Sequence, residues 1–247
     1  MATSSKPVLI IQHTAVGHPG AVLSILDELN VTWDLVALNQ GDTLPTAITP
    51  YSGLILMGGR MSANDDLEWI HTEMGLVQQA RAQGVPIAGH CLGSQIMSKA
   101  LGAQIKKNAY KEIGWQPINV VALDKVHDWF GALAEPCFVF QWHGDTFSLP
   151  EGAELLLSSE ACVNQAYVID DKHIAMQFHL EMTPLLITVS VESNGNELEK
   201  EQAAGNKYVS TKQAIVNDTL RYLPPMHAML RCVYTRWVKN LKLSPQK

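Results

Sequence analysis

The chain has 247 residues, of which 47% are hydrophobic and 17% are charged, and its formal net charge is −6. A chain of this length and composition can bury a large core, which excludes a disordered or fibrous protein. Because the sequence contains no basic block, we expect no nucleic acid among its partners.

The first long uncharged stretch, residues 7–26, is interrupted by polar and turn-forming residues such as Gln12, His18 and Pro19. It therefore does not fit a membrane-spanning helix. Its apolar run, residues 8–11, is shorter than the hydrophobic part of a signal peptide. These features predict a cytoplasmic protein that binds no membrane.

The first 105 residues alternate short apolar runs with stretches of helical spacing. Continuous apolar runs are typical of strands buried on both faces of a parallel sheet. They occupy residues 8–11, 35–38, 54–57 and 85–88, and the helical stretches occupy residues 20–29 and 67–82. Asp65 and Glu68 have the spacing of a capping box, which predicts that they open the second helix. This part of the chain therefore follows a βαβα pattern.

From about residue 104 to residue 178, the pattern changes to short strands separated by turns. The predicted strands cover residues 115–123, 137–141, 155–158, 167–169 and 174–178. No linker, internal repeat or low-complexity tract divides this region from the first. We therefore interpret these strands as additions to the same domain.

The last 65 residues are predicted to be mainly helical, most clearly over residues 226–243. Residues 185–191 are ambiguous, because their β-branched side chains favour a strand whereas Thr183 and Pro184 suit the N-cap and first position of a helix. We expect a helix there.

One cysteine has the sequence context of a nucleophile. Cys91 lies between an apolar strand and a predicted helix, and Gly89 and Gly93 stand two residues away on either side. This Gly-x-nucleophile-x-Gly pattern is typical of a sharp turn that lifts the nucleophile above a sheet. A lone cysteine is more often a small buried side chain, but the start of a helix also stabilises a thiolate. The combination favours a nucleophilic Cys91.

A cysteine nucleophile needs a base, and the best candidate is His179, where an apolar strand ends. Glu181 follows two residues later, and residues i and i+2 of an extended chain point to the same side. The Glu181 carboxylate can therefore orient the imidazole, as the third member of a catalytic triad does. A His-x-Glu pair is a weak signal alone, but it becomes specific beside the cysteine pattern.

These motifs resemble those of the class I glutamine amidotransferases. GHCLGSQ (89–95) matches the G-x-C-x-G-x-Q motif that carries the family's cysteine, and QFHLE (177–181) matches the segment with its histidine and glutamate. MGGRMSANDD (57–66) is similar to the family's oxyanion strand, and KEIGW (111–115) to its E-x-G segment. QWHGDTF (141–147) is similar to the HGD loop in the glutaminase domain of GMP synthetases.

The resemblance implies an α/β fold of the flavodoxin-like type. Its open, mostly parallel sheet carries helices on both faces, with extra antiparallel strands and a helical C-terminal segment. The whole chain, residues 1–247, is then one amidotransferase-like domain, with a catalytic core at about 7–183 and a helical extension at about 184–247.

The resemblance also implies a role for each matching residue. Cys91 is the nucleophile, His179 the base and Glu181 its orienting partner, while Gly59 and Leu92 supply the N–H groups of the oxyanion hole.

The substrate-binding residues are carried over in the same way. Gln95 contacts the bound glutamine, and the backbone around His143, Gly144 and Asp145 receives its head group. A second catalytic dyad of His143 and Asp145 is the less favoured interpretation, because Gly144 suits a turn whose backbone does the binding.

Two residues depart from the family pattern. Arg60 replaces the proline that often follows the Gly-Gly pair, which suggests a change at the mouth of the pocket. His90 stands where an aliphatic residue is commoner. We expect its side chain to point away from Cys91 into the support of the turn, and the alternative is that it perturbs the thiolate.

The implied chemistry begins with attack of the Cys91 thiolate on the γ-amide carbon of glutamine. His179 protonates the departing ammonia and then activates the water that hydrolyses the γ-glutamyl thioester to glutamate. This half-reaction needs no metal and no organic cofactor.

The sequence has no motif that indicates a nucleotide-using synthetase module, such as GxxxxGK[ST], SGGxDS or GxGxxG. The fate of the ammonia is therefore not given by the sequence, and three functions remain open. The first is an amidotransferase that passes ammonia to a separate synthetase subunit. The second is a γ-glutamyl hydrolase or peptidase, because related stand-alone proteins with similar motifs cleave γ-glutamyl peptides. The third, a non-catalytic regulatory protein, is expected to lack a triad residue, and none is missing here.

Overall fold

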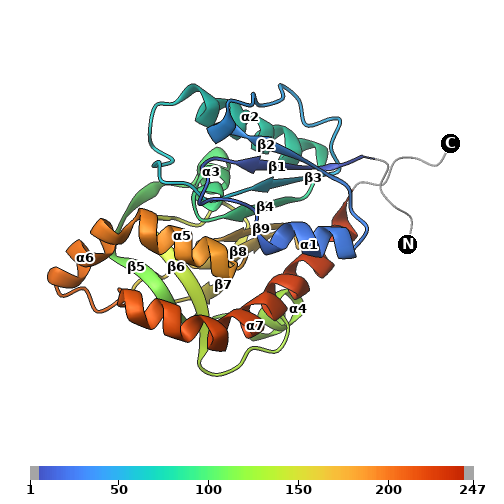
Figure 1. Ribbon diagram of the computed structural model, residues 1–247. Helices are drawn as coiled ribbons and strands as arrows, with labels where there is room; N and C mark the ends of the chain where they lie inside the picture. Colours follow the sequence, from blue (N-terminus) through green and yellow to red (C-terminus); the bar gives the residue numbers. More distant parts are fainter. Residues whose placement is uncertain (1–5, 242–247) are drawn as a thin grey trace.

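The computed structural model describes residues 6–241, and within them it contains one nine-stranded mixed sheet (Figure 1). The strand order is β2-β1-β3-β4-β9-β8-β7-β5-β6. The strands are β1 (Val8–Gln12), β2 (Trp33–Ala37), β3 (Gly53–Leu56), β4 (Ile87–His90), β5 (Ile105–Val120), β6 (Cys137–Phe147), β7 (Ala153–Ser158), β8 (Ala166–Ile169) and β9 (His173–Met176).

The five strands β2, β1, β3, β4 and β9 are parallel, and the four remaining strands continue the sheet in antiparallel pairs. In order of the chain, the parallel part is 2-1-3-4-5, which is the flavodoxin-like arrangement. The predicted α/β fold with added antiparallel strands is therefore confirmed.

Helices cover both faces of the sheet, as Figure 1 shows. They are α1 (Ala21–Glu28), α2 (Glu68–Gln83), α3 (Leu92–Ala100), α4 (Leu123–Phe130), α5 (Pro184–Ser193), α6 (Gly195–Ala203) and α7 (Lys212–Trp237). Short 3-10 turns occur at η1 (Leu38–Gln40) and η2 (Val238–Asn240). Apolar residues of α1, α4, α5 and α7 share one core cluster, and those of α2 and α3 form the other.

The central strand β1 shows why its apolar run is continuous. All five of its residues are buried, and successive side chains go to opposite faces of the sheet. Val8 and Ile10 pack into the cluster under α1 and α7, whereas Leu9 and Ile11 pack into the cluster under α2 and α3. A strand that faces two helical layers needs apolar residues at every position.

The predicted capping box at the start of α2 is wrong. The helix begins at Glu68 with Leu67 as its N-cap, and no side chain caps it. Asp65 instead accepts a hydrogen bond from the backbone N–H of Ser62 at 3.0 Å. Its carboxylate therefore closes a local turn before the helix, which is a common competing use of aspartate.

In the second half, the HGD segment differs from the expectation. The predicted strand at 137–141 extends to Phe147, so residues 141–147 lie in β6 and not in a loop. They pair with β5, where Glu112 lies opposite His143 and Gly114 lies opposite Gln141. The predicted strand 115–123 ends at Val120, and α4 begins at Leu123, a helix that the strand-like pattern did not predict.

The C-terminal region is helical, as predicted. The N-cap of α5 is Thr183, whose hydroxyl accepts a hydrogen bond from the Leu186 N–H at 3.3 Å. Helix α7 starts 14 residues before the predicted position 226 and contains Pro224 and Pro225 in its interior. Apolar packing of the residues on both sides of this pair explains why the helix continues through it. Residues 242–243 of the predicted helix lie outside the described part of the chain.

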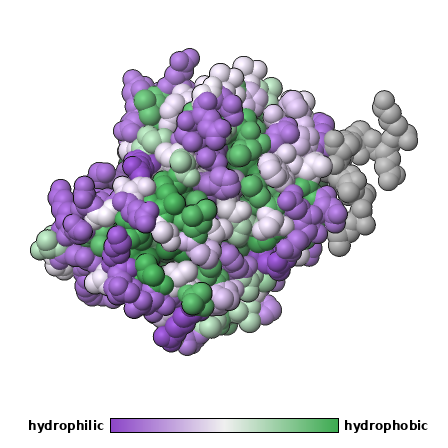
Figure 2. Space-filling model, viewed as in Figure 1, coloured by the Kyte–Doolittle hydropathy of each residue, from purple (hydrophilic) through white to green (hydrophobic). Residues whose placement is uncertain are grey.

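Within residues 6–241, no helix is long and apolar enough to span a membrane. The face drawn in Figure 2 is largely hydrophilic, and apolar side chains gather on it around α5. Leu185, near the start of that helix, is exposed.

Candidate active site

The candidate site lies at the carboxyl edge of the parallel strands, where ligands bind in open α/β sheets. Cys91 directly follows β4 and is the N-cap of α3, with φ 48° and ψ −107°. This positive φ is a strained conformation for a residue with a side chain. The Cys91 N–H donates to the Met176 carbonyl of β9 at 2.8 Å, and the Gln95 N–H donates to the Cys91 carbonyl at 3.1 Å. These bonds hold the strained turn in place.

The two glycines that flank the turn occupy positions where a side chain would clash with the backbone. A Cβ atom on Gly89 would lie 2.7 Å from the Cα atom of Ser94, and one on Gly93 would lie 2.2 Å from the Leu56 carbonyl oxygen. Both contacts are with backbone atoms, which cannot move aside. The Gly-x-Cys-x-Gly pattern is thus a consequence of how closely α3 approaches β3 and β4.

His179 and Glu181 follow β9 and lie next to this turn. The His179 N–H donates to the Phe140 carbonyl at 2.8 Å, which fixes its backbone against β6. The imidazole Nδ1 donates to Glu181 Oε1 at 2.7 Å, and His179 and Cys91 lie close enough to interact electrostatically. The structure therefore brings together the three residues that the sequence predicts as a triad.

Electrostatics favour the charged forms of the histidine and the glutamate. Burial opposes a charge on His179, but Glu181 and Cys91 together raise the pKa of His179 well above its usual value. Burial likewise opposes a charge on Glu181, while His179 and His90 hold its pKa well below the ordinary range. Glu181 is thus an ionised carboxylate with two histidine partners.

The second partner of Glu181 is His90, the residue that departs from the family pattern. Its Nδ1 lies 3.0 Å from Glu181 Oε2, and its Nε2 lies 2.8 Å from the hydroxyl of Tyr234 in α7. The two rings are stacked at 8°. The expectation that His90 points away from Cys91 into the support of the turn is confirmed. Through Tyr234, the C-terminal helix is connected to the site.

A cavity of about 310 Å³ opens in front of Cys91 and His179. Of the other predicted site residues, those that line this cavity are Gly59, Gln95, His143, Gly144 and Asp145. Arg60 lines it as well. Glu181 and Leu92 are almost completely buried beside it.

The loop after β3 leaves no room for side chains near the thiol. A Cβ atom on Gly58 would lie 2.8 Å from His179 Cε1 and 3.7 Å from the Cβ atom of Cys91. A Cβ atom on Gly59 would lie 2.6 Å from a methyl group of Leu92. The two residues predicted for the oxyanion hole, Gly59 and Leu92, are therefore neighbours beside Cys91.

Gln95 and Asp145 tie α3 to β6 at the opposite wall of the cavity. The Gln95 amide donates to the Asp145 carbonyl at 3.2 Å and to Gln177 Oε1 at 3.1 Å. The Asp145 carboxylate accepts from the Ser62 hydroxyl at 2.9 Å and pairs with Lys107 at 2.7 Å. The Asp145 segment of the cavity wall is therefore held by hydrogen bonds from Gln95 and Ser62 and by the ion pair with Lys107.

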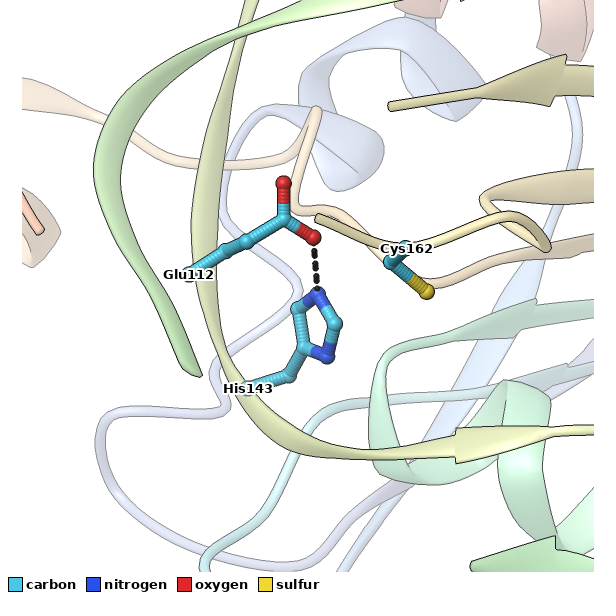
Figure 3. Close-up of side chains that lie close together, drawn as sticks. All are labelled: Glu112, His143 and Cys162. Atoms are coloured by element: carbon cyan, nitrogen blue, oxygen red, sulfur yellow. Dashed lines mark hydrogen bonds and ion pairs between the residues drawn. The ribbon is translucent and has the colours of Figure 1, made fainter. Parts of the chain in front are cut away.

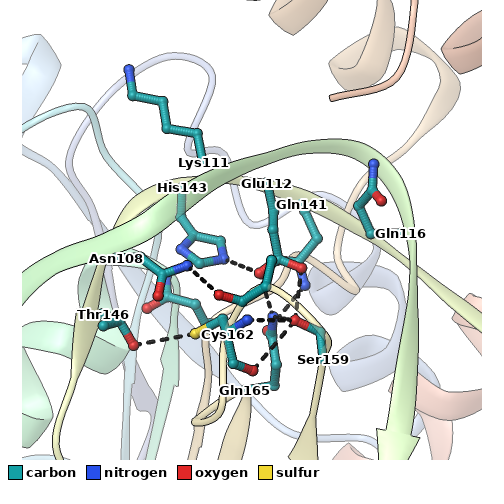
Figure 4. A network of polar contacts seen from close by, with 12 residues as sticks. Asn108, Lys111, Glu112, Gln116, Gln141, His143, Thr146, Ser159, Cys162 and Gln165 are labelled. Carbon is teal, nitrogen blue, oxygen red and sulfur yellow. Dashed lines mark hydrogen bonds and ion pairs between the residues drawn. The ribbon is translucent and has the colours of Figure 1, made fainter. Parts of the chain in front are cut away.

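A buried polar network lies behind His143, shown in Figures 3 and 4. Glu112 accepts hydrogen bonds from His143 Nε2 at 2.9 Å, Ser159 Oγ at 2.8 Å and Gln165 Nε2 at 2.7 Å. The ligand atoms of Glu112, His143 and Cys162 all lie within 4.8 Å of one another, and these residue types bind metals.

The contacts in this network identify it as a support for His143. Cys162 shares a hydrogen bond with Thr146 at 3.2 Å, and burial above all raises its pKa to about 11, so the thiol stays protonated at neutral pH. His143 Nδ1 lies 2.9 Å from the backbone carbonyl of Asp145, not from its carboxylate. This geometry argues against the His143 and Asp145 side-chain dyad.

Two buried contacts of the site have little or no signal in the sequence. The bond between His90 and Tyr234 joins residues 144 positions apart. His13 pairs with Glu73, 60 positions away, at 2.8 Å. His13 directly follows β1 at the carboxyl edge of the sheet, and this position is the feature of the sequence that could have indicated a residue of the site.

Comparison with known proteins decides the family. Residues 20–193 match the family model described as glutamine amidotransferase class-I. The chain belongs to the class I glutamine amidotransferase family. A solved glutamine amidotransferase from Methylobacillus flagellatus superimposes with a TM-score of 0.93, at 36% identity over 98% of this chain and 97% of that one.

Curated relatives of the family cover most of the chain. The glutamine amidotransferase-like protein YfeJ of Salmonella typhimurium is 27% identical and spans 82% of this chain and 86% of its own length. Gamma-glutamyl peptidase 3 of Arabidopsis thaliana is 26% identical and spans 85% of this chain and 87% of its own. Bacterial GMP synthases also match, over 53% of the chain in several cases.

Proposed function

We propose that this chain hydrolyses the γ-amide of glutamine, with Cys91 as nucleophile, His179 as acid and base, and Glu181 as the residue that orients His179. The observation that carries this proposal is that Cys91 and His179 line one cavity and interact electrostatically, while His179 pairs with an ionised Glu181 at 2.7 Å. Cys91 stands at the start of a helix and beside a histidine whose pKa is raised, which is the kind of setting in which nucleophilic cysteines occur.

The reaction follows from these positions. The Cys91 sulfur bonds to the γ-carbonyl carbon, and the C–N bond breaks as His179 transfers its proton to the departing ammonia. His179 then takes a proton from water, whose oxygen attacks the γ-glutamyl thioester. Glutamate leaves, and the sulfur returns to its thiolate form. Glu181 keeps the imidazole oriented through both steps.

The walls of the cavity supply the remaining roles in the proposal. The N–H groups of Gly59 and Leu92 stabilise the tetrahedral oxyanion, and Leu92 suits this role because it opens α3, where N–H groups lack intrahelical partners. Gln95 and the backbone of His143, Gly144 and Asp145, here part of a strand, bind the glutamate moiety. Residues about 7–183 form the catalytic core, and the extension from residue 184 supports it through Tyr234.

A specific observation favours a second candidate, a γ-glutamyl peptidase. The Arabidopsis gamma-glutamyl peptidase 3 aligns with most of this chain. The cavity also extends past the thiol to Lys111, Asn194 and Glu197, where a larger leaving group than ammonia can fit. A peptide amine leaves by the same mechanism. A non-catalytic role is disfavoured because all three reactive side chains are present and His179 interacts with both of the others.

Glutamate release from glutamine and from a panel of γ-glutamyl dipeptides tests the choice. If the chain supplies ammonia to a separate synthetase subunit, we expect slow hydrolysis of glutamine alone, because such a site is completed when the partner docks. A peptidase is expected to turn over a γ-glutamyl dipeptide quickly without any partner. If the folded protein releases glutamate neither from glutamine nor from a γ-glutamyl dipeptide, both candidate functions are contradicted.

A further inference from the structure

His13 is a completely buried histidine that contacts the glycine loop of the site. It follows β1, and its Nε2 lies 2.8 Å from Oε2 of Glu73, a residue of α2 that is also fully buried. Its Nδ1 lies 3.3 Å from the carbonyl oxygen of Gly58. His13 does not line the cavity, so it does not contact a substrate there.

We propose that the His13 and Glu73 pair is a positioning device that orients the N–H of Gly59 toward the oxyanion. The inference rests on the proposed hydrolytic function, because it assigns the support of that reaction's oxyanion hole. His13 acts through the Gly58 carbonyl and touches no reacting atom. Glu73 in turn holds the imidazole from α2.

The geometry of the peptide unit provides the connection. The Gly58 carbonyl and the Gly59 N–H belong to one planar peptide, and in a trans peptide they point in opposite directions. A Cβ atom on Gly17 would lie 2.1 Å from the Gly58 oxygen, so this oxygen points toward the loop after β1. The side of Gly58 that a Cβ would occupy faces His179 and Cys91. Holding the oxygen at His13 therefore aims the Gly59 N–H away from that loop.

The protonation of His13 fits this role. A carbonyl oxygen can only accept a hydrogen bond, so Nδ1 must carry a proton, and Nε2 donates to the Glu73 carboxylate. Burial opposes the charge of the imidazolium, but Glu73 and the backbone carbonyls of Gly58 and Met57 raise the pKa of His13 above its usual value. Both ring nitrogens are then donors, and the ring links α2 to the loop.

A matched pair of variants separates the positioning role from a structural one. In His13→Asn, the amide nitrogen takes the place of Nδ1 and keeps the bond to Gly58. In His13→Gln, the longer side chain reaches toward Glu73 as Nε2 does, and the bond to Gly58 is lost. Both variants remove the imidazolium, and each keeps one of its two contacts, so only His13→Gln retains a donor toward Glu73 and only His13→Asn retains one toward Gly58.

We expect His13→Gln to lower kcat by about 10- to 100-fold, because removing an oxyanion donor costs about 100- to 1000-fold. The kcat of His13→Asn is expected to stay within about fivefold of that of the unchanged chain. In both variants, we expect KM to change by no more than about twofold and the rate of Cys91 alkylation by iodoacetamide to stay the same. Equal losses in both variants, or a loss confined to KM, would overturn the positioning role.

Hydrogen exchange of the peptide covering residues 57–62 gives a readout that does not need turnover. Faster exchange in His13→Gln than in His13→Asn supports the anchor, and equal exchange contradicts it. If the unchanged chain releases no glutamate from any substrate, the proposed function fails, while the exchange comparison still decides whether His13 holds the loop.

Discussion

Replacing Cys91 by alanine is expected to reduce glutamate release by about a million-fold, as removal of a triad nucleophile does in a well-studied serine enzyme. The fold should persist, because the smaller side chain keeps the backbone bonds to Met176 and Gln95. Thermal unfolding and the initial rate of glutamate formation measure the two effects. Activity within tenfold of the unchanged chain would contradict a nucleophilic role.

The other cysteines are the controls for this change. Burial raises the pKa of both Cys137 and Cys162 to about 11, so neither thiol is reactive near neutral pH. Cys232 is exposed but does not line the cavity in front of Cys91. Alanine at each of these positions is expected to leave the rate within about twofold, since the reacting groups are untouched.

His179→Ala and Glu181→Gln form the second large prediction. Loss of the histidine is expected to cost about as much as loss of the cysteine, because it removes both the base and the proton donor. Loss of the Glu181 charge is expected to cost less, about 1000- to 10,000-fold in kcat, by analogy with the acidic member of other triads. Initial rates with saturating substrate measure both.

A matched variant tests whether Glu181 acts through His179. His90→Gln removes the other histidine partner of the carboxylate but leaves the bond between His179 and Glu181. We expect a far smaller loss than in Glu181→Gln. An unchanged rate in Glu181→Gln would mean that another residue orients the imidazole.

The parts of the site that could be predicted are those whose residues are close together in the sequence. Cys91 lies two positions from each flanking glycine, and the space at Gly89 and Gly93 explains why that spacing is visible. His179 and Glu181 are two positions apart at the end of a strand. Local spacing is sufficient when one turn of backbone brings the groups together.

The parts that could not be predicted depend on distant pairing. The HGD segment became a strand because β5 supplies its hydrogen bonds, and nothing within residues 141–147 indicates that neighbour. The same holds for His90 with Tyr234 and for His13 with Glu73. A buried histidine has no periodic pattern, so its partner becomes visible only when the helices are packed on the sheet.

The proline pair in α7 shows how tertiary packing can override a local rule. Pro224 and Pro225 predict a helix boundary, and each proline removes a backbone donor. The helix nevertheless runs through them, because Leu223 and Met226 are buried in the core. The burial of apolar side chains on both sides outweighs the lost hydrogen bonds.

The most direct test of the central claim is covalent labelling by a glutamine-like diazoketone, followed by mass spectrometry of the peptides. The reagent needs only the nucleophile and the γ-glutamyl pocket, so it does not depend on a partner or on the choice between the two candidate functions. We predict one adduct, on Cys91, which glutamine competes away, and no adduct on the exposed Cys232. An adduct on another cysteine, or none on folded protein, would contradict the account.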